Sequence, residues 1–498
     1  MMKTPVLAVI LALLATALAM TAHGEIGSQT ELQQPVPIER TTFEYDAYAA
    51  YQDGEAPTPT EAPPAPSPGD TPPEVPVDDS AVATDAVPVV PPEATEQEPV
   101  TPSTLTSGTA CRSCRKSRCR CGCREPWKLP QPCFFKKRGI MIGGWLEQGI
   151  TFNGNNPADG FNGPVGTNDL DGEYQMNQLW LYITKPTKTD GCGWDIGGHF
   201  DILFGSDWRF GINQGLEDRI NGFNGQTYGT VIPQAYMEVA VNDLTVKLGH
   251  MAGILDYEVV PAVPNPFYSH SYCYAFTVPQ LVTGVLADYK LTDQLSVQGG
   301  FTRGWMKFED NNHHMDFMGG VKWVSSDKRT SLAYALNMGP QDDAGEHDRY
   351  SGSLVLQHQL TKKLRYVLVQ NAGVEFGGAD AGTRDAEWYG INQYFLYQLN
   401  PCWALNTRIE WLRDDDGTRV GGPPPQAGIR AWPLSGFAGN FYECSVGLRW
   451  TPRKNIIVRP ELRWDWYEGE TNAGGFLPFN DGNNKNQFLF GTDLIVTF

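Results

Sequence analysis

The stretch IIVRPELRWDW, residues 456–466, alternates between apolar and charged side chains along most of its length. Successive residues of a β-strand point to opposite faces, so this stretch predicts a strand with one apolar and one charged face. The charged face carries Arg459, Glu461, Arg463 and Asp465. Two kinds of protein place the two faces of a strand in different environments. In a transmembrane barrel one face meets lipid and the other a polar lumen, and in a β-sandwich one face meets the core and the other bulk water.

The same alternation recurs from residue 139 to residue 498 and predicts about sixteen strands. Most are about 9–12 residues long, which is the length that a tilted strand needs to cross a bilayer. The expected strands lie near 140–152, 173–184, 194–205, 231–241, 244–250, 282–290, 295–305, 315–324, 330–338, 350–360, 364–376, 387–398, 402–413, 440–450, 455–467 and 487–498.

The connections between these strands separate the barrel from the sandwich. Long connections such as 251–281 and 414–439 alternate with short ones such as 242–243 and 361–363. Long loops on one rim and short turns on the other are typical of an up-and-down transmembrane barrel. The fold class expected is therefore all-β, an antiparallel up-and-down barrel of about 16 strands. An even number of strands places both of its ends on the short-turn side, which we expect to be periplasmic.

The last residue, Phe498, closes a stretch whose apolar residues share one face, as in barrels that insertion machinery places in an outer membrane. Aromatic residues near strand ends form girdles at the two membrane interfaces. Ordinary core packing explains any single aromatic residue equally well. The tryptophans expected in girdles against outer-membrane lipid are Trp145, Trp180, Trp323, Trp403, Trp450 and Trp466.

The N-terminal part has three expected segments. Residues 1–24 resemble a secretory signal peptide, with Lys3 before a short apolar run and small residues at the end. Residues 25–110 are rich in Pro, Ala, Thr and acidic residues, which predicts a disordered linker in the periplasm. Residues 111–138 are a basic, Cys-rich segment. The barrel follows from 139 to 498.

The Cys-rich segment contains CRSCRKSRCRCGC, residues 111–123. CxxC spacing suits zinc, but an exported chain meets an oxidising compartment, which favours disulfides. The basic residues also suit an anionic lipid or polymer. Disulfides are therefore expected and no metal is assigned. The sequence does not choose among the 15 possible pairings of six cysteines. The disulfide candidates are Cys111, Cys114, Cys119, Cys121, Cys123 and Cys133.

Charge and motifs argue against several classes of protein. Residues 139–498 carry 40 acidic and 26 basic residues, without the broad basic face of a nucleic-acid-binding protein. No HExxH, GxSxG or P-loop motif is present, so we expect no enzyme and no cofactor. Acidic clusters at 308–312 and 414–417 could hold calcium, although exposed loop tips account for them too.

Three segments carry a resemblance to a known family. They are HFDILFGSDW (199–208), VKLGHMAGILDYEVVPAVPNPFYSHSY (246–272) and TGVLADYKLTDQLSVQGGFTRGWMKFEDNN (283–312). In order and spacing they resemble the β-barrel porin family described as OmpL-like, over most of residues 139–498. The resemblance implies a porin-like barrel of the outer membrane and leaves the solute open.

The third long connection, 251–281, is the candidate functional segment. In general porins the loop at this place folds into the lumen and narrows the pore. By that analogy Asp256 and Glu258 face arginines of the late strands, and a ring of fixed charge selects ions. Charge neutralisation within the lumen is the alternative. The pore-lining candidates are Asp256, Glu258, Arg408, Glu410, Glu443, Arg449, Arg459, Glu461, Arg463 and Asp465.

The sequence leaves three functions open. The first is a channel for passive diffusion of ions and small hydrophilic solutes, with a mild preference for cations. The second is a plugged structural or adhesive barrel that anchors the envelope through its periplasmic linker. The third is a secreted, lectin-like β-sandwich. A homotrimer is expected only by analogy with general porins.

Overall fold

The computed structural model describes residues 127–498, except residue 190, residues 223–225 and residues 422–435. The predicted signal peptide, the linker and five of the six candidate disulfide cysteines lie outside the described residues. No helix among the described residues is long and apolar enough to cross a membrane.

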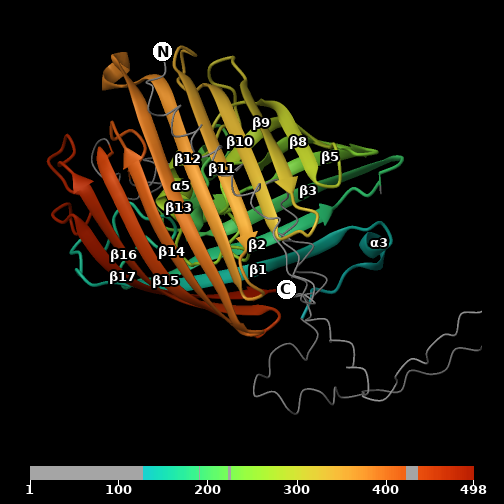
Figure 1. Cartoon of the computed structure of the whole chain (residues 1–498), viewed down its shortest axis with the longest axis horizontal. Coiled ribbons are helices and arrows are strands. Elements are labelled where there is room, and N and C mark those ends of the chain that lie inside the picture. Colours follow the sequence, from blue (N-terminus) through green and yellow to red (C-terminus); the bar gives the residue numbers. More distant parts are fainter. Residues whose placement is uncertain (1–126, 190, 223–225, 422–435) are drawn as a thin grey trace, which may run out of the picture. The chain divides into compact units, whose positions relative to one another are not determined.

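Strands make up most of the described chain (Figure 1). The helices are short: α3 (Cys133–Lys136), η2 (Ser206–Phe210), α4 (Glu217–Asn221), α5 (Tyr272–Thr277) and η3 (Asp380–Gly382). The strands are β1 (Met141–Asn153), β2 (Tyr174–Lys185), β3 (Trp194–Gly205), β4 (Gly229–Val231), β5 (Ala235–Val241), β6 (Leu244–Ala252), β7 (Leu281–Lys290), β8 (Leu295–Thr302), β9 (Asp316–Val324), β10 (Thr330–Pro340), β11 (Asp348–Gln359), β12 (Leu364–Ala379), β13 (Arg384–Asn400), β14 (Trp403–Asp414), β15 (Gly439–Arg453), β16 (Ile456–Gly469) and β17 (Asn486–Thr497).

The sheet closes on itself. β1 pairs antiparallel with β2 on one side and with β17 on the other, and every other strand pairs antiparallel with its neighbours. β4 and β5 both pair with β3, one after the other, so together they fill one position in the wall. The expected antiparallel barrel of 16 strands is confirmed. The break between β4 and β5 contains Pro233, which has no N–H to give to the ladder.

The two faces of the wall differ in polarity. On β16, Leu462 and Trp464 are 46% and 50% exposed on the outside, whereas Arg459 and Arg463 are buried on the inside. Other outward side chains, such as Ile409, are also large, apolar and exposed. An apolar belt around a polar interior is what a bilayer requires of a spanning barrel.

Aromatic pairs stand on the outer face near both ends of the wall. Trp403 and Trp450 stack at 5.3 Å between ring centroids close to the short turns, and Tyr442 stacks with Trp466 close to the long loops. Trp145 and Trp180 do not belong to these girdles, and the prediction for them was wrong.

Trp145 and Trp180 point into the barrel because they share their strand faces with Glu147 and Gln178. Their rings stack at 4.7 Å, and the Trp145 Nε1–H donates to Gln178 Oε1 at 3.0 Å. They pack with Ala262 of a long loop, which gives the lumen an apolar patch at this point.

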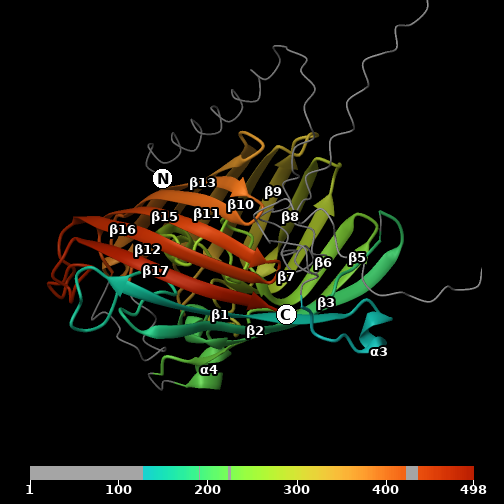
Figure 2. The ribbon, with the colours of Figure 1, turned by 90° about the horizontal axis from the view of Figure 1, so that it is seen from below.

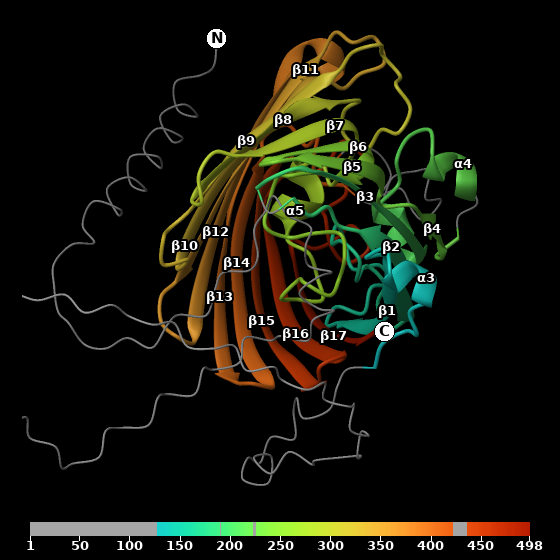
Figure 3. The same ribbon diagram turned by 90° about the vertical axis from the view of Figure 1, so that its right-hand side faces the viewer.

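The connections follow the predicted alternation, except that β12 and β13 are joined by residues 380–383 alone, where a longer connection, 377–386, was expected. At the tightest turn Asn242 has φ +53°, a left-handed conformation that Asn tolerates. Among the long loops, the β3–β4 connection carries α4 on the outside of the wall (Figure 2), where Asn221 hydrogen-bonds to the backbone of Thr230 in β4. Loop L3, residues 253–280 between β6 and β7, turns the other way, and its helix α5 lies inside the ring of strands (Figure 3).

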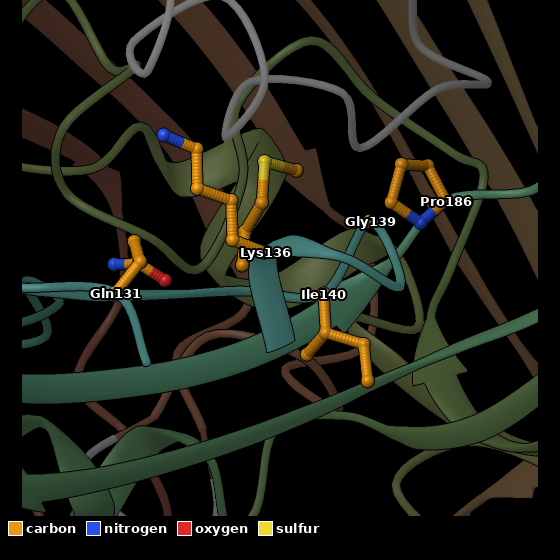
Figure 4. A pocket seen from close by; sticks show the side chains of 6 residues that line it. Gln131, Lys136, Gly139, Ile140 and Pro186 are labelled. Atoms are coloured by element: carbon orange, nitrogen blue, oxygen red, sulfur yellow. The ribbon is translucent and has the colours of Figure 1, made fainter. Parts of the chain in front are cut away.

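The segment before β1 packs on the short-turn rim. The Gln131 side-chain amide donates to the Ile142 carbonyl at 2.6 Å and accepts from the Ile142 N–H at 2.9 Å. The Trp127 ring contacts the Phe498 ring edge to face. A cavity of about 420 Å³ opens beside α3, lined by Gln131, Lys136, Gly139, Ile140, Met141 and Pro186 (Figure 4). None of these residues belongs to L3 or to the predicted charged wall, so this cavity is separate from the candidate site.

Candidate functional site

Loop L3 crosses the lumen and is closed at its base. The Gly253 N–H donates to the Gln280 carbonyl at 2.9 Å, where the loop leaves β6 and enters β7. A Cβ on Gly253 would lie 2.1 Å from the Pro279 carbonyl oxygen, so only glycine allows this approach. Inside the loop, the Ser271 side chain caps α5 by accepting the Tyr274 N–H at 3.1 Å.

Glu258 is the most connected acid of L3. Its carboxylate accepts from Arg408 at 3.0 Å, from the Tyr394 hydroxyl at 2.6 Å and lies 2.7 Å from His270 Nδ1. Burial raises the pKa of Glu258, but the Arg408 and His270 charges and hydrogen bonds outweigh it and hold the pKa at about 2. Glu258 is therefore a fixed negative charge that ties L3 to β13 and β14.

Asp256 has different partners from those predicted. Its φ is +78°, and its carboxylate accepts the Tyr257 N–H and the Asn371 side-chain amide, both at 2.6 Å. Burial and the neighbouring Glu258 charge raise the pKa of Asp256 to about 6. The expected pairing of L3 acids with arginines thus holds for Glu258, whereas Asp256 contacts Asn371 of β12 through its carboxylate and Ser353 of β11 through its backbone N–H.

The acids of the wall accept hydrogen bonds from the L3 backbone. Glu410 accepts from the N–H groups of Tyr272 and Cys273 at 2.8 and 2.6 Å. Glu461 accepts from those of Tyr268 and Ser269 at 3.1 and 3.0 Å. These amides lie in a loop without a regular ladder, so the carboxylates satisfy buried donors that would otherwise lack a partner.

The arginines of the wall bind the L3 carbonyls. Arg459 donates to the carbonyls of Ala262 and Asn265 at 2.9 and 2.8 Å, and Arg463 to that of His270 at 2.7 Å. Arg449, which is only half-buried, donates to the carbonyls of Asn265 and Val263 at 3.1 Å. The loop therefore follows a track of alternating donors and acceptors along β14–β16.

Acids beside these arginines balance their charge. Glu443 accepts from Arg408 at 2.9 Å, and Asp465 accepts from Arg463 at 2.8 Å. Arg459 pairs with two acids that the sequence analysis missed, Glu147 of β1 and Asp493 of β17. Both acids lie on predicted strands, on the face opposite the apolar residues, so the alternation pattern could have identified them.

L3 also contacts the opposite side of the barrel through apolar side chains. Ile254, Leu255 and Val278 pack with Leu286 of β7, Met318 of β9, and Ala333 and Ala335 of β10. Tyr257 packs with valines of β11 and β12. The loop thus contacts both halves of the wall.

The described cysteines are scattered over the fold. Cys133, the one disulfide candidate in the described part, has a free and exposed thiol. Cys402, in the turn before β14, is disulfide-bonded and was not among the candidates. Within the described ranges, no group of three or more His, Cys, Asp or Glu side chains is placed to hold a metal ion. The pairing of the other five candidates stays a prediction.

Solved structures with some likeness to this chain include an outer-membrane channel and a porin. The OprB structure from Pseudomonas putida is 14% identical, with a TM-score of 0.46 over 73% of this chain and 96% of that chain. The channel DcaP of Acinetobacter baumannii is 11% identical, with a TM-score of 0.45 over 72% and 97%. An anion-selective porin from Comamonas acidovorans is 11% identical, with a TM-score of 0.45 over 72% and 99%. No curated protein matches the chain.

A family model provides the assignment. It matches residues 139–498, which is the whole barrel and more than half of the chain. The three segments that carry the sequence resemblance all lie within this range. The chain belongs to the porin family described as "Putative beta-barrel porin-2, OmpL-like".

Proposed function

We propose that the protein is an outer-membrane channel for the passive diffusion of ions and small hydrophilic solutes. The observation that carries this proposal is the contrast between the apolar outer face of the wall and its polar inner face, together with a long loop inside the lumen. A polar lumen lowers the cost of moving hydrated solutes past the bilayer, and an inward loop sets the size and charge of the passage.

In this proposal L3 determines which solutes pass. The ten predicted charged residues either belong to L3 or hold it in place. Most of them contact L3 backbone or one another, so they position the loop and set the electrostatic potential of the constriction. Solutes would pass between L3 and the wall. The family assignment also supports a channel rather than an enzyme, because the members of this family are described as porins.

A second function, a plugged barrel with a structural or adhesive role, is favoured by one specific observation. The side chains of L3 are largely buried, and they contact strands on both sides of the lumen. Such a barrel would anchor the envelope through the linker at residues 25–110, which we propose to lie in the periplasm. The proposed partners are outer-membrane lipid, the insertion machinery and, by analogy, two further copies in a homotrimer.

Single-channel recording separates these two functions. The mature chain, folded in detergent and shown by heat-modifiable gel migration to be a barrel, is added to a planar bilayer under a salt gradient. We expect stepwise current with a reversal potential that reports ion selectivity. Folded protein that inserts without current steps would contradict the channel and support the plugged barrel.

A further inference from the structure

A second charged cluster lies on the inner wall at the long-loop end, beyond the contact between Ser351 of β11 and Thr277 of L3. Its wall residues are paired across neighbouring strands, Arg349 of β11 with Glu375 of β12, and Gly373 of β12 with Trp388 of β13. The β8–β9 loop adds Trp305, and the β14–β15 connection adds Arg419. We call Arg349, Trp305, Trp388 and Arg419 the Arg–Trp cluster.

Aromatic rings hold the two guanidinium groups of this cluster close together. The Arg349 Cζ lies 4.6 Å from the centre of the Trp305 ring, and the Arg419 Cζ lies 5.6 Å from the same ring and 5.0 Å from that of Trp388. The two rings meet edge to face at 6.3 Å. Each contact is a favourable cation–π interaction, whereas the two like charges beside one ring repel each other.

The cluster has more hydrogen-bond donors than acceptors. Arg349 gives its Nε and Nη2 to Glu375 at 3.0 and 2.7 Å, and Arg419 gives its Nε to the Thr418 carbonyl at 3.1 Å. Among the described residues, no acceptor meets Arg349 Nη1, either Nη of Arg419, or the buried Nε1 of Trp305.

Nearby acids do not fill this deficit. The Asp414 carboxylate is occupied by the backbone N–H groups of Thr418, Arg419 and Val420, at 2.8–3.1 Å. Glu375 already accepts from Arg349. Unfilled donors on two guanidinium groups beside the Trp305 ring are suited to an oxyanion, because guanidinium groups bind carboxylate and phosphate oxygens with strong, charge-assisted hydrogen bonds.

The cluster is partly exposed at the long-loop end of the wall. The Arg349 and Glu375 side chains are each 11% exposed, and Trp305 and Arg419 are half-buried. We infer that the Arg–Trp cluster binds the oxyanion group of a small anionic solute, with the Trp305 face beneath the remainder of the solute. This inference rests on the proposed channel function in one respect: it names the class of solute that the channel admits.

Binding is measured by isothermal titration calorimetry on the full chain, folded in detergent, with glucose 6-phosphate as the probe and glucose as the uncharged control. We expect glucose 6-phosphate to bind and glucose not to bind. Arg419→Gln removes charged donors and lowers the affinity about tenfold. The matched control is Arg413→Gln, because Arg413 lies near the same strand end, pairs with Asp415 and is not part of the cluster; its affinity stays unchanged.

The double variant Arg349→Gln/Glu375→Gln removes the second guanidinium without leaving a lone buried charge, and it is expected to weaken binding as Arg419→Gln does. Equal affinity for glucose, absence of binding, or undiminished affinity in both cluster variants would overturn the site. A protein that binds glucose 6-phosphate but passes no current would keep the site and refute the channel. A conducting protein without binding would do the reverse.

Discussion

Glu258 joins three groups that belong to different parts of the barrel, so its charge is central to the position of L3. Glu258→Gln leaves Arg408 buried with fewer acids around it. Breaking one side of a buried ion pair costs about 3–5 kcal/mol, so we expect the loop to open more often. Limited proteolysis within residues 253–280 of the folded barrel measures this opening, and the variant should be cut faster than the native chain.

The control is Glu309→Gln. Glu309 pairs with Arg219, and both side chains are more than half exposed. Exposed pairs contribute about 0–1 kcal/mol, so this variant should be cut at the native rate. Equal protection of the loop in Glu258→Gln and in the native chain would show that this charge does not hold L3.

The two acids of L3 respond to pH in opposite ranges. The pKa of Asp256 is raised to about 6, so its contribution to stability is complete at low pH and is lost as pH rises through about 6. The pKa of Glu258 is lowered from 4.5 to about 2, so its contribution is complete at neutral pH and is lost as pH falls from 4.5 through about 2.

Acidification from pH 7 to pH 5 should therefore protonate Asp256 and leave Glu258 charged. The loop becomes better protected from proteolysis, and the cation preference decreases because one negative charge is lost. Both changes should be smaller in Asp256→Asn, which lacks this titrating group. Identical pH profiles for the native chain and this variant would assign the effect to another residue.

Among the elements, the base of L3 is tightly constrained. Gly253→Ala places a methyl group against the Pro279 carbonyl oxygen, and overpacking of this kind costs about 1–3 kcal/mol. We expect faster proteolysis of L3 and a lower temperature for the heat-modifiable transition. The matched control is Gly154→Ala, where the nearest atom to the new Cβ lies at an ordinary 3.4 Å. Loss of stability in both variants alike would remove the special role of the base.

The strands were predictable from sequence because apolar and polar side chains alternate along each strand, and this alternation indicates the environment of each face. Leu462 and Trp464 indicate lipid, and Arg459 and Arg463 indicate a polar interior, without knowledge of any partner strand. The partners of a residue are set by register and by loops, which local patterns do not encode. For this reason the polar face of β16 was predicted, whereas the Asp256–Asn371 contact was missed.

The inward tryptophans show the same limit. Trp145 and Trp180 were predicted in girdles because a large aromatic residue near a strand end is common at membrane interfaces. Their inward direction depends on the strand faces that they share with Glu147 and Gln178, and their apolar surroundings are supplied by L3 from far along the chain. Alternation read across β1 would have corrected the first of them.

For the whole barrel, charge sets the expected selectivity. Residues 139–498 carry 40 acidic and 26 basic residues, and many of the arginines are bound to acids within the lumen. We expect a mild preference for cations in a potassium chloride gradient at pH 7. A reversal potential of the sign that favours chloride would show that the arginines, and not the excess of acids, govern the passage.

In the proposed channel, ions pass through the lumen and L3 narrows their path. Shortening L3 is the most direct test of this path. Because Gly253 and Gln280 already meet at its base, a short Gly–Ser bridge can replace residues 256–277 without opening the wall. Single-channel current is then compared between the native and shortened barrels, both heat-modifiable. We predict stepwise current in both, with a larger conductance in the shortened barrel. Equal conductance, or no current from either barrel, would contradict a passage through the lumen past L3.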